Sequence, residues 1–206
     1  MLVVALVGSL IVRAAIAQPS YVPTSDMENT LQPGDRVLVL KGLASIMGPS
    51  RGEVVMLRDP GGWTETGSAS PGFGESVLAF LGLAPSVSRD DLVMRVIGLG
   101  GDTVACCTKE GKISVNGVAL NEPYLPLGMA TDQVTFDVTV PDGSLFVMGD
   151  NRAASRDSRY HLDVNSGGVP TGSLLGRVGV VLWPLGHAAL VRIPHAFARI
   201  PDPGTP

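Results

Sequence analysis

The chain has 206 residues, of which 45% are hydrophobic and 17% are charged, and its formal net charge is -4. A chain of this length forms one domain, or one domain with a small inserted lobe. Because the net charge is negative and no basic run occurs, nucleic acid is not an expected partner. No spacing of Cys and His is typical of a zinc site, so we expect neither a metal nor a cofactor.

The N-terminal residues 1–18 predict a membrane anchor. They are apolar up to Val12, and if Arg13 snorkels to the interface the apolar length reaches about 17 residues, close to the roughly 20 that span a bilayer. The alternative is a secretory signal peptide, because Ala15 to Ala17 is similar to a cleavage site. Its positive charge follows the apolar run instead of preceding it, which favours the anchor. A wrongly assigned start would explain the shortness of this anchor.

The rest of the chain has the pattern of β-structure. Short apolar or alternating runs are separated by Gly, Pro and Asn turns, and Asn116-Gly117 predicts a hairpin. We expect a loop over 59–75 and one short helix over 76–85. The adjacent Cys106 and Cys107 are expected to be two small buried hydrophobes without a disulfide. The predicted strands lie within 35–40, 52–57, 91–99, 112–120, 132–140, 145–152 and 176–184.

Four segments in order resemble one family, the type I signal peptidases. The first runs from Pro23 to Leu31 and continues to Gly34-Asp35, the second from Met94 to Asp102, the third from Gly149 to Arg159, and the fourth from Gly176 to Pro184. The resemblance extends from about residue 10 to 184 of the chain. Members of this family are membrane-anchored serine endopeptidases that remove signal peptides from translocated proteins.

The resemblance implies a mostly β fold, with a signal-peptidase-like β-sheet core, a small inserted β lobe and an N-terminal transmembrane helix. The implied parts are an anchor over 1–18, a core over 19–104 and 144–186, a lobe over 105–143 and a C-terminal tail over 187–206. It also implies a single-pass protein of the cell membrane with its main domain on the extracytoplasmic side. The implied partners are signal peptides of exported preproteins, membrane lipid, and an active relative with which the chain could pair.

The two catalytic positions of the family are both substituted here. The family's nucleophilic serine corresponds to Asp26, and its general-base lysine corresponds to Met94. A carboxylate is a poor nucleophile toward an amide, and a methionine has the shape of a lysine stem but no titratable nitrogen. Loss of a nucleophile and base that act as a unit costs about 10⁶ in kcat. The sequence therefore predicts a catalytically impaired member, a signal-peptide-binding pseudoprotease.

The resemblance also assigns roles to residues that are retained. Thr24 takes the position of an oxyanion donor, and Ser155 takes the position of the serine that supports the base. Four charged residues of the third segment are expected to shape its turn, among them an Asp157–Arg159 pair that braces it. These four residues are Asp150, Arg152, Asp157 and Arg159.

Other residues could in principle replace the missing pair. Ser25 neighbours the nucleophile position and would make the chain an active peptidase with a displaced nucleophile. His161 follows the third segment, and Asp26 could form an acid pair with Asp150 or Asp157. None of the three lysines, Lys41, Lys109 and Lys112, matches the base position. A last alternative is a membrane-tethered scaffold module that has lost the groove.

Overall fold

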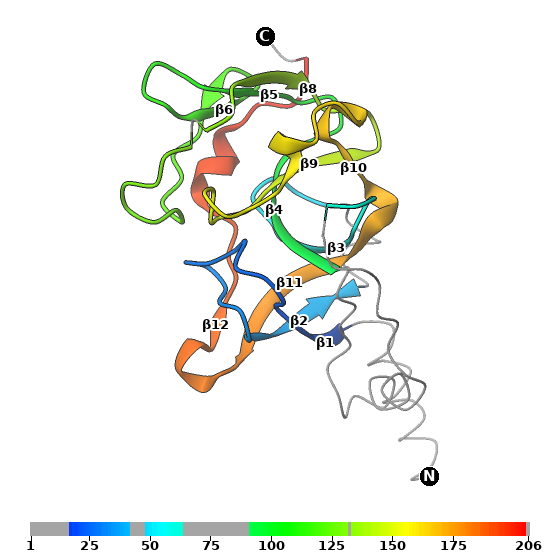
Figure 1. Cartoon of the computed structure of the whole chain (residues 1–206), viewed down its shortest axis with the longest axis vertical. Coiled ribbons are helices and arrows are strands. Elements are labelled where there is room, and N and C mark those ends of the chain that lie inside the picture. The colour runs from blue at the N-terminus through cyan, green and yellow to red at the C-terminus, as the bar shows by residue number, and fades with distance from the viewer. Residues whose placement is uncertain (1–16, 42–47, 64–90, 132, 205–206) are drawn as a thin grey trace.

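The computed structural model describes residues 17–41, 48–63, 91–131 and 133–204 (Figure 1). Within these ranges the regular structure consists of strands and short 3-10 helices. The strands are β1 (Ala17–Tyr21), β2 (Arg36–Leu40), β3 (Val54–Arg58), β4 (Asp91–Leu99), β5 (Thr103–Cys106), β6 (Ile113–Val115), β7 (Val118–Ala119), β8 (Phe136–Thr139), β9 (Ser144–Met148), β10 (Val169–Pro170), β11 (Leu174–Trp183) and β12 (Ala189–Leu190). The 3-10 helices are η1 (Ser158–Tyr160), η2 (Asn165–Gly167), η3 (Thr171–Ser173), η4 (Leu185–His187) and η5 (His195–Arg199). The prediction of a mostly β protein is thus confirmed.

The larger sheet carries the segments that resemble signal peptidases. Its strand order is β1-β2-β11-β3-β4-β9-β10, and β12 pairs with β11 at the side. Strand β4 lies inside the sheet and is buried along most of its length, which explains why its sequence is apolar apart from Asp91 and Arg95. Apolar side chains of this sheet form one cluster with Met27 and Leu31 of the β1–β2 connection and another around Met94 and Val147. The first segment, through Met27 and Leu31, and strand β9, which leads into the third segment, therefore both pack against β4.

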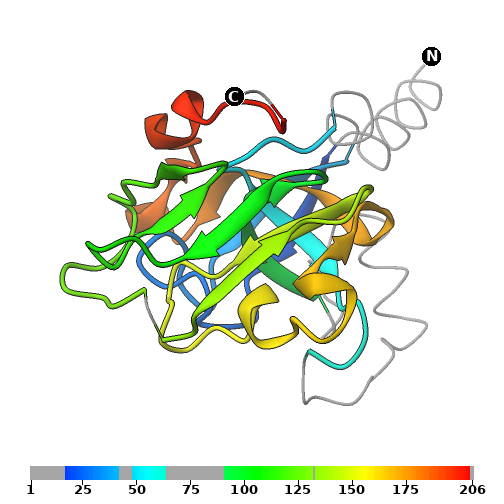
Figure 2. The same cartoon turned by 90° about the horizontal axis from the view of Figure 1, so that it is seen from above.

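A second sheet, of order β7-β6-β5-β8, lies at the end of the molecule near the C-terminus (Figures 1 and 2). Its β6–β7 hairpin turns at Asn116-Gly117, where both residues have positive φ, as the sequence predicts for this dipeptide. Residues 187–206, expected as a tail, contribute Phe197 and Ile200 to the apolar cluster that the second sheet shares with β4 and β9. The division of the chain into core, lobe and tail stays a prediction.

Polar contacts fix the second sheet and the C-terminal segment to the larger sheet. Arg51 donates two hydrogen bonds of 2.7 Å to the carboxylate of Asp102, which precedes β5. Asn116 Nδ2 donates to the Pro201 carbonyl at 2.9 Å. A Cβ on Gly52 would lie 2.5 Å from the Phe197 ring, so this position admits no side chain without displacement. The C-terminal segment is therefore packed against both sheets.

The predicted membrane anchor, residues 1–18, lies outside the described residues except for Ala17 and Gln18. The structure places those two in β1, which pairs antiparallel with β2. Among helices of the described ranges, none has the length and apolar character needed to cross a bilayer. The short helix expected over 76–85 and most of the loop expected over 59–75 also lie outside the described residues.

The structure joins Cys106 and Cys107 in a disulfide, so the expectation of two separate thiols is wrong. The peptide bond between the two residues is cis. Their Cα atoms are 3.0 Å apart, whereas a trans peptide would separate them by about 3.8 Å. Cys106 is the last residue of β5 and is buried.

Candidate active site

The first segment forms a compact turn between β1 and β2. Val22, Met27 and Leu31 are fully buried in one apolar cluster and fix the ends of the turn. The backbone N–H of Leu31 donates to the Met27 carbonyl at 2.8 Å, and Val22 and Asp35 are joined by a backbone hydrogen bond of 2.9 Å. The burial of these apolar side chains holds the turn against side chains of β2, β3, β4 and β11 in the larger sheet.

The third segment holds the first segment through backbone groups. The Asn151 N–H donates to the Asp26 carbonyl at 2.8 Å. The Asn151 side chain donates from Nδ2 to the Ser25 carbonyl at 3.2 Å. Since both acceptors are backbone oxygens, the side chain at position 26 does not contribute to either contact.

Gly149 lies beside two of the predicted site residues, Asp26 and Ser155. The β4–β9 ladder pairs Arg95 with Met148, the last residue of β9, and Gly149 follows directly. A Cβ built on Gly149 would lie 2.6 Å from the Asp26 carbonyl oxygen and would also collide with the Ser155 side chain. Ser155 and the Asp26 backbone therefore meet at one glycine that has no room for a side chain. Met94 precedes Arg95, the strand partner of Met148.

Ser155 is buried and its hydroxyl has no partner. Its relative exposure is 3%, and its Oγ makes no hydrogen bond. A buried hydroxyl normally finds a partner, because leaving it unpaired costs free energy. Met94, which is only 1% exposed, offers a thioether, which is a weak acceptor and no donor.

The carboxyl group of Asp26 lies half-buried in the turn. Burial raises the pKa of Asp26 above its ordinary value, the hydrogen bond from Thr24 acts in the opposite direction, and the negative charge of Asp157 raises the pKa further. The Thr24 hydroxyl donates to Asp26 Oδ2 at 2.5 Å. Thr24, which was expected to donate a hydrogen bond to an oxyanion, instead donates to the side chain of Asp26 at the nucleophile position.

Two buried ion pairs shape the frame of the site. Arg95 donates from Nε and Nη2 to Asp150 at 2.8 and 2.6 Å, and Thr30 donates to the same carboxylate. Asp157 pairs with Arg159 at 2.8 Å, and its other oxygen accepts the Gly149 N–H at 3.0 Å. The Asp157–Arg159 pair is therefore fixed to the glycine at the centre of the site.

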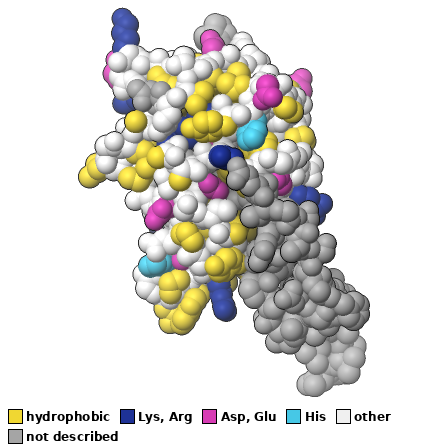
Figure 3. All heavy atoms as spheres, in the orientation of Figure 1, with side chains coloured by type: hydrophobic (Ala, Val, Ile, Leu, Met, Phe, Trp, Pro, Cys, Tyr) yellow, Lys and Arg dark blue, Asp and Glu magenta, His cyan; other side chains and the backbone are white. Residues whose placement is uncertain are grey.

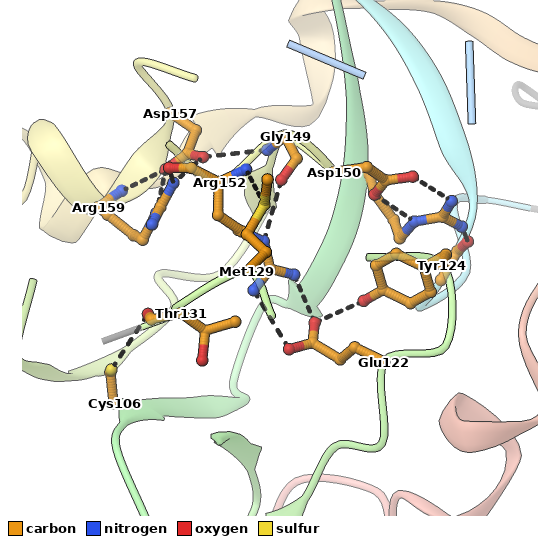
Figure 4. Close-up of polar contacts among 12 residues, drawn as sticks. Cys106, Glu122, Tyr124, Met129, Thr131, Gly149, Asp150, Arg152, Asp157 and Arg159 are labelled. Atoms are coloured by element: carbon orange, nitrogen blue, oxygen red, sulfur yellow. Dashed lines mark hydrogen bonds and ion pairs between the residues drawn. The ribbon is translucent and has the colours of Figure 1, made fainter. Parts of the chain in front are cut away.

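A third ion pair, which the sequence analysis missed, reaches the site from the lobe (Figure 4). Arg152 donates to both carboxylate oxygens of Glu122, and the Tyr124 hydroxyl donates to Glu122 Oε1 at 2.6 Å. The Arg95 guanidinium lies over the Tyr124 ring, 4.1 Å from its centre. No periodic pattern marks Glu122 or Tyr124 in the sequence, so only their place in the fold reveals these contacts.

The other candidates lie in different surroundings. His161 stacks on Trp63 with ring centres 4.3 Å apart. Lys109 and Lys112 are exposed on the lobe, and Lys41 follows the end of β2. Within the described ranges, no group of three or more His, Cys, Asp or Glu side chains is arranged to hold a metal ion.

Comparison with known proteins identifies the family. Residues 1–183 match the family model described as signal peptidase, peptidase S26. The chain therefore belongs to the signal peptidase family, and the resemblance found in the sequence is confirmed. It is 36% identical to a probable signal peptidase I of Mycobacterium leprae, over 82% of this chain and 69% of that protein.

Two further relatives extend this similarity. The signal peptidase I of Mycobacterium tuberculosis is 34% identical over 92% of this chain and 73% of its own length. A probable signal peptidase I-2 of Synechocystis is 33% identical over 92% of this chain and 74% of its own length. A solved signal peptidase I from Enterococcus faecalis is 25% identical, covers 63% of this chain and 96% of its own, and superposes with a TM-score of 0.41, too low to support an argument about the fold.

Proposed function

We propose that this chain is a member of the signal peptidase family that binds signal peptides of exported preproteins without cleaving them. The observation that carries the proposal is the buried, unpartnered hydroxyl of Ser155 beside Gly149 and the Asp26 backbone. The resemblance gives this hydroxyl the role of supporting a base amine, and Met94, which stands at the base position, has no amine. The surroundings of a general base are thus retained while the base is missing.

The chemistry of Asp26 supports the same proposal. A hydrolase of this kind needs a hydroxyl that a neutral amine can deprotonate. Attack by the Asp26 carboxylate would form an anhydride instead of an ester, and Thr24 already donates to that carboxylate at 2.5 Å. Since nucleophile and base act as a unit, loss of both lowers kcat by about 10⁶. A peptide that binds at the retained site is therefore not cleaved at a rapid rate.

The frame that remains favours peptide binding over a loss of all function. Arg95–Asp150, Arg152–Glu122 and Asp157–Arg159 are buried ion pairs, and a buried pair that loses one partner is strongly destabilising. The backbone hydrogen bond between Asn151 and Asp26 holds the first segment at the same place. The arrangement around Gly149 is thus kept, which supports binding at this place, and the crosslinking experiment described below separates binding from a scaffold role.

We also infer contact with membrane lipid, through the predicted anchor of residues 1–18 and through the hairpin of β11 and β12. Hydrophobic side chains gather on this hairpin in Figure 3, and large apolar side chains of Leu182, Trp183, Leu185 and Leu190 are exposed there. A single-pass protein of the cell membrane, with its main domain on the extracytoplasmic side, fits this surface. Binding of the full chain to vesicles, with Leu185→Ser/Leu190→Ser as the comparison, tests the inference.

The proposed function is tested with a fluorogenic peptide that contains an Ala-x-Ala site. The unaltered chain is expected to give no turnover, and Asp26→Ser/Met94→Lys is expected to cleave the peptide. The single variants Asp26→Ser and Met94→Lys serve as matched controls and are expected to stay inactive, because each lacks one half of the pair. Robust cleavage by the unaltered chain would overturn the proposal.

Two alternatives are separated by related experiments. If Ser25 were a displaced nucleophile, Ser25→Ala would abolish any cleavage by the unaltered chain, so a loss of measured activity in that variant would favour it. A photo-crosslinkable signal peptide distinguishes binding from a scaffold role. Labelling of the chain supports the proposed function, whereas its absence favours a membrane-tethered scaffold. Co-purification with an active signal peptidase relative would identify the chain's expected protein partner.

A further inference from the structure

We propose that Tyr124, in the segment that joins β7 to β8, is a positioning residue that sets the geometry of the candidate site. Its ring fixes the side chain of Arg95, the neighbour of Met94 in the chain, and its backbone fixes the turn that carries Asp26. The effect of Tyr124 on the turn is independent of the proposed function. Its effect on peptide binding rests on that function.

The first argument is the position of the Tyr124 ring. The guanidinium of Arg95 lies 4.1 Å from the ring centre, and the Phe197 ring is stacked on the tyrosine with 6.3 Å between ring centres. The Arg95 side chain is only 2% exposed, and a guanidinium withdrawn from water is attracted strongly to an aromatic face. The orientation of Arg95 therefore depends on Tyr124 as well as on Asp150.

The second argument is a closed ring of contacts that begins and ends at Tyr124. Arg95 lies over the tyrosine ring and donates to Asp150, and the Thr30 hydroxyl donates to the same carboxylate. The side chain of Asn29 donates from Nδ2 to the Tyr124 carbonyl. Because Asn29 and Thr30 are consecutive residues, the first segment is bound both to Tyr124 and to the partner of Arg95. No member of this ring can shift without displacing its neighbours.

The third argument is the backbone of Asn29, whose φ is 93°. Positive φ is uncommon for residues other than glycine and is maintained only where the surrounding structure holds it. The hydrogen bond from the Asn29 side chain to the Tyr124 carbonyl stabilises this conformation. The same turn contains Asp26, whose carbonyl accepts from the Asn151 N–H at 2.8 Å. The contact between Tyr124 and Asn29 therefore determines how the turn presents position 26.

The fourth argument is that Glu122 holds Tyr124 in turn. The Tyr124 hydroxyl donates to Glu122 Oε1 at 2.6 Å, and Arg152 donates to both oxygens of that carboxylate (Figure 4). Burial and the charge of Glu122 raise the pKa of Tyr124 well above its ordinary value, so the hydroxyl stays a donor at neutral pH. Arg152 Nε also donates to the Gly149 carbonyl at 3.0 Å. One short segment thus contacts both halves of the site, the first segment at Asn29 and the third at Arg152.

The test measures hydrogen exchange of the full chain at the backbone amides of Thr30, Leu31 and Asn151, which all donate to carbonyls of the turn. Tyr124→Leu removes the aromatic face, and Asn29→Gly tolerates positive φ but has no side chain to donate. Each is expected to raise exchange at these amides about tenfold, as a local opening predicts. Tyr124→Phe keeps the ring over Arg95 and is expected to retain most of the protection.

A matched control separates positioning from a general loss of stability. Val169 is fully buried in strand β10 at the edge of the larger sheet, so Val169→Ala destabilises the chain through a lost apolar side chain. It is expected to leave the amides of the turn protected. The double variant Tyr124→Leu/Asn29→Gly is expected to raise exchange no further than the stronger single variant, because both changes act through one contact.

Fluorescence anisotropy with a labelled signal peptide connects the turn to binding. Tyr124→Leu is expected to raise Kd about tenfold, and Tyr124→Phe and Val169→Ala are expected to stay within about twofold of the unaltered chain.

The two measurements distinguish this inference from the function on which it partly rests. Unchanged exchange in both Tyr124→Leu and Asn29→Gly would overturn the inference, as would an equal rise in Val169→Ala or an equal loss of protection in Tyr124→Phe. An unchanged Kd despite raised exchange would overturn the role of Tyr124 in peptide binding. Raised exchange in a chain that binds no signal peptide would leave Tyr124 as the residue that positions the turn and would overturn the proposed function.

Discussion

The backbone N–H of Asn151 donates a hydrogen bond to the backbone carbonyl of Asp26, with 2.8 Å between nitrogen and oxygen. This contact joins two segments that lie far apart in the sequence and that both belong to the resemblance. Because it uses main-chain atoms, it remains possible whichever side chain stands at position 26. The substitution of the nucleophile position therefore changes the chemistry of the site while the backbone frame stays in place.

The first prediction concerns the ionisation of Asp26. Burial raises the pKa of Asp26 above its ordinary value of 3.8, so the ionised form destabilises the folded chain. The stabilisation from the bound proton is complete below 3.8 and is lost as the pH rises through the folded-state pKa. Asp26→Asn cannot ionise and is expected to raise Tm by about 3 °C at pH 7, corresponding to about 1 kcal/mol. Calorimetry over a pH series measures this difference.

The control for that series is Asp142→Asn, which changes an exposed acid of a turn. Its Tm is expected to follow that of the unaltered chain at every pH. A lower Tm for Asp26→Asn at pH 7 would mean that the ionised carboxylate of Asp26 makes a stabilising contact, which contradicts the destabilising effect expected from its burial.

The second prediction concerns Gly149. A Cβ at this position would lie 2.6 Å from the Asp26 carbonyl oxygen and would collide with the Ser155 side chain. Gly149→Ala is therefore expected to destabilise the chain by about 1–3 kcal/mol, the usual cost of overpacking, and to abolish peptide binding. Gly117→Ala provides no comparison, because that glycine has positive φ. Gly172→Ala is the better control, since its Cβ would meet nothing within 4 Å.

The third prediction concerns the Arg95–Asp150 pair. Asp150→Ala leaves the buried guanidinium of Arg95 without its carboxylate and is expected to cost about 3–5 kcal/mol in a urea titration. The double variant Arg95→Met/Asp150→Leu removes both charges and is expected to recover most of that loss. Asp163→Ala, at an exposed position, is the control. A loss no larger than that of the control would show that the pair does not stabilise the frame.

Strand β4 shows how far the sequence alone can lead. Its predicted range, 91–99, equals the observed one, because a strand buried on both faces has a mostly apolar sequence and this one is followed by the Gly100-Gly101 turn. Strand β1 was not predicted. Its five residues, Ala17–Tyr21, continue an apolar stretch and include a proline, and they become a strand through pairing with β2. The local sequence pattern of residues 17–21 does not show that they will pair with β2.

In the candidate site, too, some residues could be predicted from the sequence and others could not. Asp26, Met94 and Ser155 were identified from motif order, and the structure brings the Asp26 backbone and Ser155 together at Gly149. Glu122 and Tyr124 could not be predicted, because their segment of the lobe has no periodicity and their importance arises from Arg152 and Arg95, which approach across the fold. Buried ion pairs between distant segments leave no local signal in a single sequence.

The fourth prediction tests whether Ser155 faces position 94. In the unaltered chain, Ser155→Ala removes an unpaired buried hydroxyl and is expected to be neutral or to stabilise by up to about 1 kcal/mol. In a Met94→Lys background the hydroxyl gains an amine partner, so the same change is expected to destabilise. A double-mutant cycle of unfolding free energies should give a coupling of about 1 kcal/mol. Additive free energies would mean that the two side chains do not meet.

The central claim, that the unaltered chain performs no peptidase chemistry, is tested most directly by its intact mass. The full chain in detergent is incubated with a signal-peptide substrate, quenched with acid within the turnover time, and measured by mass spectrometry, with Asp26→Ser/Met94→Lys treated in parallel. We expect a peptide adduct on the double variant and an unchanged mass for the natural sequence. An acyl adduct on any residue of the unaltered chain would contradict the account.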